Sequence, residues 1–255
     1  MTKTIALAGK GGTGKTTVAA LLIRALLRRS SRPVLAIDAD PATNLHMALG
    51  LPAPSTVGGI REDMLQPQAA AQLGVAVTRH DHLTREVRLA LEEGERVDLL
   101  AMGRPEGQGC YCAVNHLLRT VVDDLSGRYD YVVVDNEAGM EHISRRTTRD
   151  VDVLLVVTDP TLRGLRAAET IARMAGEIEV NVKQTLLVIN RLDGPVPAPL
   201  QQALEALGLE LGARIPADPE VGRLDALGQP LVELPEASPA AQAVDVLAAR
   251  ILNGP

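Results

Sequence analysis

A glycine-rich loop at residues 9–17 places the strongest constraint on how this chain can fold. It reads Gly-Lys-Gly-Gly-Thr-Gly-Lys-Thr-Thr, and it follows an apolar run at residues 4–8 that is typical of a buried strand. Apolar residues then repeat at helical spacing over residues 16–29, so the loop lies where a strand passes into a helix. This context predicts a phosphate-binding loop, because glycines let backbone N–H groups turn inward around a phosphate.

The residues of this loop have separate expected roles in holding a nucleotide. Lys15 can reach the β- and γ-phosphates, and the Thr16 hydroxyl can ligate Mg²⁺. Lys10 and Lys15 make up half of the four lysines in the chain, which concentrates this residue type in one loop. The other loop residues expected to contact the phosphates are Gly11, Gly12, Thr13, Gly14 and Thr17.

Two carboxylates, Asp38 and Asp40, follow a second predicted strand at residues 33–37. Carboxylates at the end of a parallel strand lie at the edge where α/β sheets bind ligands. Either could hold Mg²⁺ through water or orient the water that attacks a γ-phosphate. The alternative is an Asp-Pro turn that caps a helix.

A further carboxylate, Asp135, ends a predicted strand at residues 129–135. At this position it is expected to hold Mg²⁺ through water, as in other phosphoryl-transfer sites. Glu137 and Gly139 follow in a loop, and the glycine gives that loop freedom to move when the γ-phosphate leaves. The sequence therefore predicts a switch next to the metal-binding carboxylate.

The order of predicted strands and helices indicates an α/β fold with a mostly parallel central sheet and helices on both faces. At 255 residues and 46% hydrophobic residues, the chain can bury a full core as a single domain over residues 1–255. Further strands are expected at residues 97–103, 153–158 and 185–189, and further helices at 84–93, 114–125, 164–175 and 239–251.

Composition disfavours several classes of partner. The net charge is −6, which argues against nucleic acid held by phosphate neutralisation, and 1% aromatic residues leave little for base stacking. No apolar run approaches the ~20 residues that span a bilayer, and the first residues lack the pattern of a secretory signal. We therefore expect a cytoplasmic protein that binds neither nucleic acid nor membrane.

Cys110 and Cys112 are the only cysteines in the chain. A disulfide between residues so close in sequence would be rare and strained, so paired thiolate ligands are the favoured interpretation. Two thiolates do not complete a four-coordinate site. Either other side chains join them, or a two-fold dimer brings two pairs together as a Cys₄ site. Two incidental loop cysteines are the alternative.

The loop with its early lysine, Lys10, resembles the deviant Walker A motif of the family that includes the MinD and ParA ATPases, the nitrogenase iron protein and several metal-insertion ATPases. The resemblance implies that Lys10 crosses a dimer interface to the partner's nucleotide, and that Asp40 positions the water that attacks ATP. It also implies adenine contacts from the residues at the end of a strand and in a later loop: Asn190, Arg191, Pro216 and Asp218.

Two stretches, residues 109–119 and 135–147, further resemble the CooC-type accessory ATPases. This resemblance implies an ATP-dependent homodimer that binds Ni²⁺ through Cys110 and Cys112 and delivers it to apo carbon monoxide dehydrogenase or acetyl-CoA synthase. Zn²⁺ is also possible, because soft thiolates take it as readily.

Two other functions share the nucleotide motifs. A MinD- or ParA-like positioning ATPase should show a basic surface or an amphipathic tail, and the last predicted helix has neither. An iron–sulfur reductase like the nitrogenase iron protein would also build a Cys₄ dimer site, but its cysteines lie well apart in sequence.

Overall fold

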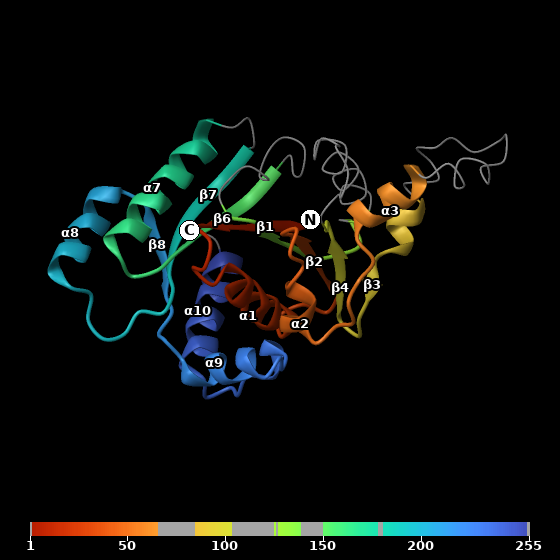
Figure 1. The fold of residues 1–255 in the computed structure, drawn as a ribbon. Helices are drawn as coiled ribbons and strands as arrows, with labels where there is room; N and C mark the ends of the chain where they lie inside the picture. The colour runs from red at the N-terminus through yellow and green to blue at the C-terminus, as the bar shows by residue number, and fades with distance from the viewer. Residues whose placement is uncertain are drawn as a thin grey trace.

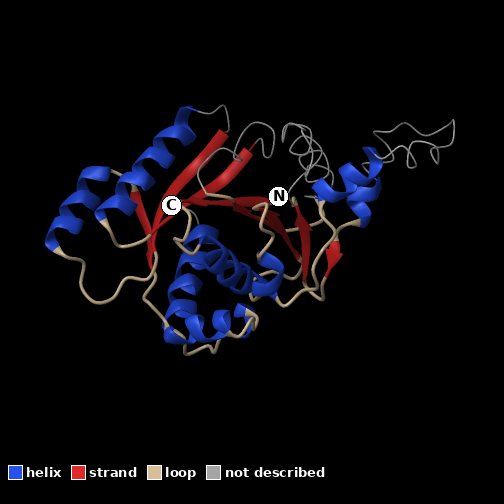
Figure 2. Cartoon of the chain, viewed as in Figure 1, coloured by secondary structure: helices blue, strands red, loops and turns tan. Residues whose placement is uncertain are grey.

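A sheet of eight strands runs through the middle of the protein, with helices on both faces (Figures 1 and 2). The computed structural model describes residues 2–65, 85–103, 125, 127–138, 150–177 and 181–253. The strands are β1 (Lys3–Gly9), β2 (Val34–Ala39), β3 (Glu92–Glu93), β4 (Val97–Ala101), β5 (Tyr131–Asn136), β6 (Asp150–Thr158), β7 (Asn181–Ile189) and β8 (Glu210–Arg214). Their order across the sheet is β3-β4-β2-β5-β1-β6-β7-β8.

All neighbouring strands are parallel except β3 and β4, which are antiparallel. Strand β1 lies between β5 and β6, so the glycine-rich loop leaves from the interior of the sheet. A Cβ on Gly9 would lie 2.3 Å from the Val157 carbonyl oxygen, so only glycine fits at this end of β1. Asp38 and Asp135 are direct neighbours in the β2–β5 register, which brings both carboxylates to the same edge.

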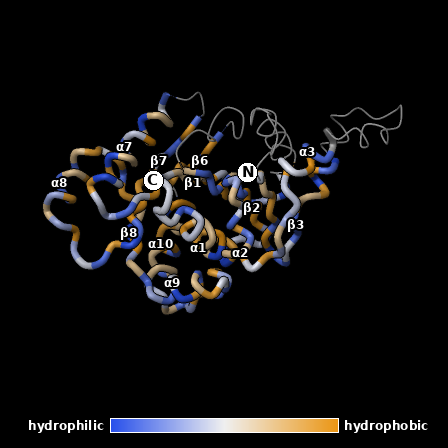
Figure 3. The backbone as a smooth tube through the Cα atoms, viewed as in Figure 1, coloured by the Kyte–Doolittle hydropathy of each residue, from blue (hydrophilic) through white to orange (hydrophobic). Residues whose placement is uncertain are grey.

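The helices divide between the two faces of the sheet. One face is covered by α1 (Lys15–Leu27), α2 (Leu45–Leu49), α9 (Pro219–Ala226), the 3₁₀ turn η1 (Leu231–Glu233) and α10 (Pro239–Asn253), whose apolar residues share one buried cluster. The opposite face is covered by α3 (Val57–Leu65), α7 (Leu162–Glu177) and α8 (Ala198–Leu207). Alternate residues along the central strands, such as Ile5 and Ala6 of β1, enter one cluster or the other, as the two-residue period of a strand requires. Figure 3 shows hydrophobic stretches, in orange, along the backbones of α1 and α10.

The predicted α/β class, the parallel sheet and its flanking helices are confirmed, and the predicted strands are found within a few residues of their expected bounds. The prediction of a helix over residues 84–93 is wrong at its C-terminal end. Helical residues stop at 89, and Glu92–Glu93 pair with β4 as an edge strand. The helix predicted at 114–125 lies almost wholly outside the described residues. Single-domain organisation over residues 1–255 stays a prediction.

Candidate active site

The glycine-rich loop has the backbone shape that phosphate binding requires. Gly12 and Gly14 have φ angles of 80° and 85°, in the left-handed region that residues with a Cβ rarely adopt. A Cβ on Gly14 would also lie 2.3 Å from Asn190 Nδ2. Helix α1 begins directly after the loop, so the free N–H groups of its first turn point toward the loop.

Lys15 lies against this loop with most of its side chain buried. Its Nζ is 3.4 Å from the Lys10 carbonyl oxygen, which also accepts a 2.9 Å hydrogen bond from the Thr13 hydroxyl. Burial lowers the pKa of Lys15, and the carboxylates of Asp135, Asp40 and Glu137 act in the opposite direction. The ammonium is thus held in a partly desolvated position where an added anion would stabilise its charge.

Asp135 and Thr16 form the part of the site that suits a cation. The Thr16 hydroxyl donates a 2.6 Å hydrogen bond to Asp135 Oδ2, while Asp135 Oδ1 is buried and has no hydrogen-bond partner among the described residues. Burial raises the pKa of Asp135 to about 6, although Thr16 and Lys15 lower it. A carboxylate and a hydroxyl are oxygen ligands of the kind that Mg²⁺ takes, so the residues present fit this ion.

Asp38 closes the loop that carries Asp40. Its Oδ1 accepts a 3.1 Å hydrogen bond from the Asp40 backbone N–H, and its Oδ2 accepts one of 2.9 Å from the Leu45 N–H. Burial raises the pKa of Asp38 to about 7, and Asp135 adds to this while the two backbone donors oppose it. Asp38 therefore orders the loop, and its predicted role as a Mg²⁺ ligand stays a prediction.

The loop, Asp40 and Glu137 surround one pocket of about 340 Å³. Asp40 is half-buried, and its Oδ1 accepts a 2.8 Å hydrogen bond from the Ala42 N–H. The residues that line this pocket are Gly11, Gly12, Gly14, Lys15, Thr16, Asp40, Glu137, Ala138 and Arg191. Most of the predicted phosphate-binding residues are thus brought together with the expected water-orienting carboxylate and the first switch residue. Thr13 is buried within the loop and Thr17 lines the neighbouring pocket instead.

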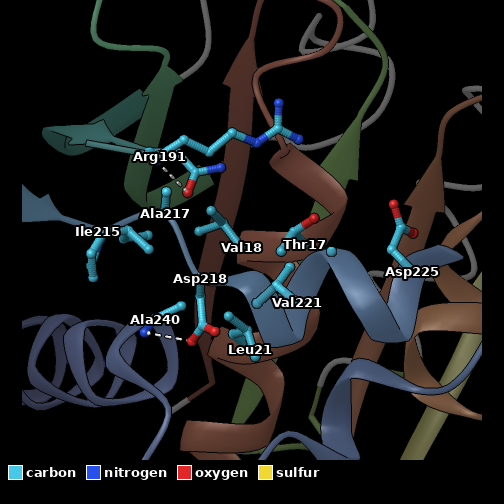
Figure 4. Close-up of a pocket in the computed structure, with 13 residues that line it drawn as sticks. Thr17, Val18, Leu21, Arg191, Ile215, Ala217, Asp218, Val221, Asp225 and Ala240 are labelled. Carbon is cyan, nitrogen blue, oxygen red and sulfur yellow. Dashed lines mark hydrogen bonds between the residues drawn. The ribbon is translucent and has the colours of Figure 1, made fainter. Parts of the chain in front are cut away.

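A second pocket, of about 240 Å³, adjoins the start of α1 (Figure 4). It brings together the four residues expected to surround adenine: Asn190, Arg191, Pro216 and Asp218. Sequence reasoning missed its apolar wall, which includes Val18, Leu21, Ile215 and Val221. These aliphatic residues follow the same periodicity as the core, and no local signal distinguishes a pocket wall from buried packing.

Two polar residues of this pocket, Asn190 and Asp218, form hydrogen bonds within the protein that support the pocket. Asn190 Nδ2 donates a 2.9 Å hydrogen bond to the Thr13 carbonyl, which braces the phosphate-binding loop. Asp218 caps α9 by accepting from the Glu220 N–H at 2.9 Å, and its other oxygen accepts from the Ser238 hydroxyl at 2.5 Å and the Ala240 N–H at 3.3 Å. Figure 4 shows the Asp218 carboxylate directed toward Ala240. Asp218 thus fixes the wall of the pocket rather than offering a free carboxylate.

The remaining predicted site residues differ in how far the structure describes them. Lys10 is exposed, and within the described part of the chain its ammonium takes part in no hydrogen bond or ion pair. Cys110, Cys112 and Gly139 lie outside the described residues.

A strand, glycine-rich loop and helix with a buried lysine, and a Thr–Asp pair at the adjacent strand end, define a P-loop ATPase. The chain belongs to the CobQ/CobB/MinD/ParA nucleotide-binding domain family, whose model matches residues 4–231.

Relatives agree with this assignment. An uncharacterized ATP-binding protein of Methanocaldococcus jannaschii is 41% identical over 249 residues, covering 98% of each chain. The carbon monoxide dehydrogenase accessory protein CooC of Rhodospirillum rubrum is 36% identical over 201 residues, covering 75% of each chain. Among solved structures, MinD of Pyrococcus horikoshii in complex with Mg-ADP has a TM-score of 0.67 and 26% identity, covering 97% of this chain and 95% of that one.

The buried Asp135 carboxylate should make the stability of the nucleotide-free protein depend on pH. Folding raises the pKa of Asp135 to about 6, so between about pH 4 and 6 the folded state binds a proton that the unfolded chain releases. This contribution stabilises the protein at low pH and is lost as the pH rises through this range. We expect Asp135→Asn to gain stability relative to the wild type by on the order of 2 kcal/mol between pH 4 and 7. Urea unfolding at both pH values measures this, and a pH-independent difference would contradict it.

Proposed function

We propose that this chain is an ATP-driven, dimerising metallochaperone that binds Ni²⁺ through Cys110 and Cys112 and helps to insert it into carbon monoxide dehydrogenase or acetyl-CoA synthase. The observation that carries the proposal is the combination of the P-loop site with a Cys-x-Cys pair in a chain 36% identical to CooC. Nucleotide would supply the energy or the timing for metal delivery.

The site supports a specific division of work during ATP hydrolysis. Lys15 binds the phosphates, and the half-buried Asp40 at the edge of the phosphate pocket orients the water that attacks the γ-phosphorus as the bond to the β-phosphate oxygen breaks. Thr16 and Asp135 would hold Mg²⁺, which neutralises phosphate charge when bound. The MinD structure with Mg-ADP supports binding of a nucleotide and Mg²⁺ by this site.

The exposed position of Lys10 supports a role across a homodimer interface. Its backbone carbonyl accepts hydrogen bonds from Thr13 and Lys15 within the loop, whereas its side chain is exposed and could extend to a second subunit. An exposed lysine in the phosphate-binding loop can reach nucleotide held by a second copy, which would make dimerisation depend on nucleotide.

A metal site shared between subunits would bias the same dimerisation. Structural zinc sites in small peptides are worth ~10–16 kcal/mol, so two Cys pairs that close around one ion could stabilise a dimer strongly. Metal and ATP would then be linked, because each favours the same assembled state.

The number of metal ions bound per dimer tests this proposal. One chain offers two thiolates and a closed site needs four ligands, so we expect one Ni²⁺ or Zn²⁺ per dimer. Cys110→Ser and Cys112→Ser should each lose metal binding and metal-induced dimerisation while ATP binding stays within a few-fold of the wild type. Equilibrium dialysis with metal analysis and analytical ultracentrifugation measure both quantities.

His116 supplies the matched control for this experiment. If His116 completed a site inside one chain, one metal per monomer would bind without association, and His116→Ala would remove it. That outcome, or a Cys110→Ser protein that still dimerises on adding metal, would show the shared thiolate site to be wrong. Visible absorbance of the anaerobically purified protein separates a plain thiolate site from an iron–sulfur cluster.

The likeness to MinD supports a second candidate, a spatial positioning ATPase. Membrane attachment through the last helix would need an apolar face that is open to lipid. In α10, however, Val244, Leu247 and Ile251 are buried against the rest of the protein. ATP-dependent sedimentation with anionic lipid vesicles would favour the positioning function, and its absence together with metal binding would favour the metallochaperone.

A further inference from the structure

Arg191 has an unusual backbone conformation at the end of β7. Its φ is 58°, in the left-handed region that favours glycine, and the described chain has only one other non-glycine residue with positive φ, Thr43. The conformation is held from both sides, because Asn190 Oδ1 accepts from the Arg191 N–H at 3.0 Å and the Leu192 N–H donates to the Ile215 carbonyl at 3.0 Å. Strained residues held in this way are concentrated at functional sites, so the direction of this side chain is informative.

The side chain reaches over the phosphate-binding loop. One terminal nitrogen of its guanidinium, NH1, donates to the Gly12 carbonyl at 3.2 Å, and the other, NH2, is 3.7 Å from the position of a Cβ on Gly14. Arg191 also lines the phosphate pocket beside Lys15 and Asp40. Figure 4 shows the guanidinium pointing away from Ile215 and Ala217, which are part of the apolar pocket.

The charge balance of the phosphate pocket adds an independent reason for a cation here. The groups on or beside the pocket include the cations Lys10, Lys15 and Arg191 and the carboxylates Asp38, Asp40, Asp135 and Glu137. Lys10 is exposed and does not line this pocket, which leaves Lys15 and Arg191 as its cationic lining residues among several carboxylates. Removing Arg191 would leave a single lysine for the phosphates.

We infer that Arg191 binds the β- and γ-phosphates of the nucleotide on its own subunit, rather than the adenine ring. When nucleotide binds, the guanidinium exchanges the Gly12 carbonyl for phosphate oxygens, which its paired donors fit better. The left-handed turn at Arg191 aims the side chain from the base pocket back across the loop. This inference rests on nucleotide binding by the site and is independent of the proposed metal cargo.

Binding affinities for adenosine, AMP, ADP and ATP, which differ only in their number of phosphates, separate a phosphate contact from a base contact. Each ligand, with Mg²⁺, is competed against a fluorescent ATP analogue on the wild type and on Arg191→Ala. We expect affinity for ADP and ATP to fall roughly 10- to 100-fold, the range of a lost charge-assisted hydrogen bond, and affinity for adenosine and AMP to change less than about 3-fold.

Three further variants keep the test decisive. Arg191→Gly relieves the backbone strain and lacks the guanidinium, so it should fold and show the same loss as alanine. Arg191→Lys keeps a point charge and should recover part of the loss. Arg223→Ala is the matched control, because Arg223 pairs with Glu220 on the surface of α9 and lines neither pocket.

An equal loss of affinity for all four ligands, or no loss at all, would overturn the inference, the first in favour of a base or ribose contact. A wild type that bound none of the ligands would refute the nucleotide site as a whole, and a wild type that bound ATP but no metal would refute only the metallochaperone function.

Discussion

Replacing Lys15 with alanine is expected to weaken ATP binding by more than ~100-fold. Its side chain lies buried against the phosphate-binding loop, with the ammonium 3.4 Å from the Lys10 carbonyl, so its removal takes away a direct charge partner for the phosphates. Isothermal calorimetry with Mg-ATP measures the change. Lys183→Ala is the matched control, since Lys183 forms an exposed ion pair with Asp152 away from the site and its loss should leave affinity unchanged.

Lys10→Ala should have the opposite pattern. Lys10 is exposed and does not line the phosphate pocket, so ATP binding to the monomer should stay measurable while nucleotide-dependent dimerisation is lost. Light scattering on the same samples separates the two lysines. A Lys10→Ala protein that still dimerises with ATP would refute the cross-subunit role.

Asp40→Asn is expected to slow ATP hydrolysis by ~10²-fold or more while ATP and Mg²⁺ binding are retained, because a water-orienting carboxylate acts mainly in the transition state. Asp40 lines the phosphate pocket, and the amide can still accept from the Ala42 N–H, so the loop should keep its shape. Single-turnover phosphate release measures the rate, and calorimetry verifies binding.

Two neighbouring carboxylates serve as comparisons for Asp40. Asp38→Asn should act differently, because Asp38 holds the backbone N–H groups of Asp40 and Leu45 and its replacement disturbs the loop itself. Glu137→Gln tests the other carboxylate of the pocket. If Asp40→Asn hydrolyses ATP within a few-fold of the wild type and Glu137→Gln does not, the water-orienting role belongs to Glu137.

The phosphate side of the site could be predicted from sequence because local constraints determine it. Gly12 and Gly14 occupy left-handed positions that few other residues tolerate, and parallel strands bring Asp38 and Asp135 to one edge. These are properties of short segments, so the motif and the fold follow together.

The base side could not be predicted in the same way. Its wall comes from Ile215, Val221 and the buried side of α1, which are brought together only by tertiary packing. Strand β8 is a partly exposed edge strand with the sequence Glu-Leu-Gly-Ala-Arg, which carries no clear two-residue alternation. Asp218 caps α9 locally, but its second contact, with Ser238 and Ala240 some 20 residues away in sequence, likewise forms only through tertiary packing.

The affinity for Ni²⁺ in the presence and absence of a non-hydrolysable ATP analogue shows whether nucleotide and metal binding are coupled through one dimer. If nucleotide and metal both favour one dimer, the analogue should tighten Ni²⁺ binding by roughly 10-fold or more, and Ni²⁺ should tighten analogue binding by the same factor, since linkage is reciprocal. Lys10→Ala should remove the coupling while keeping both ligands. Ni²⁺ affinity that is identical with and without the analogue in the wild type would show that nucleotide does not control metal binding, and would contradict an ATP-driven metallochaperone.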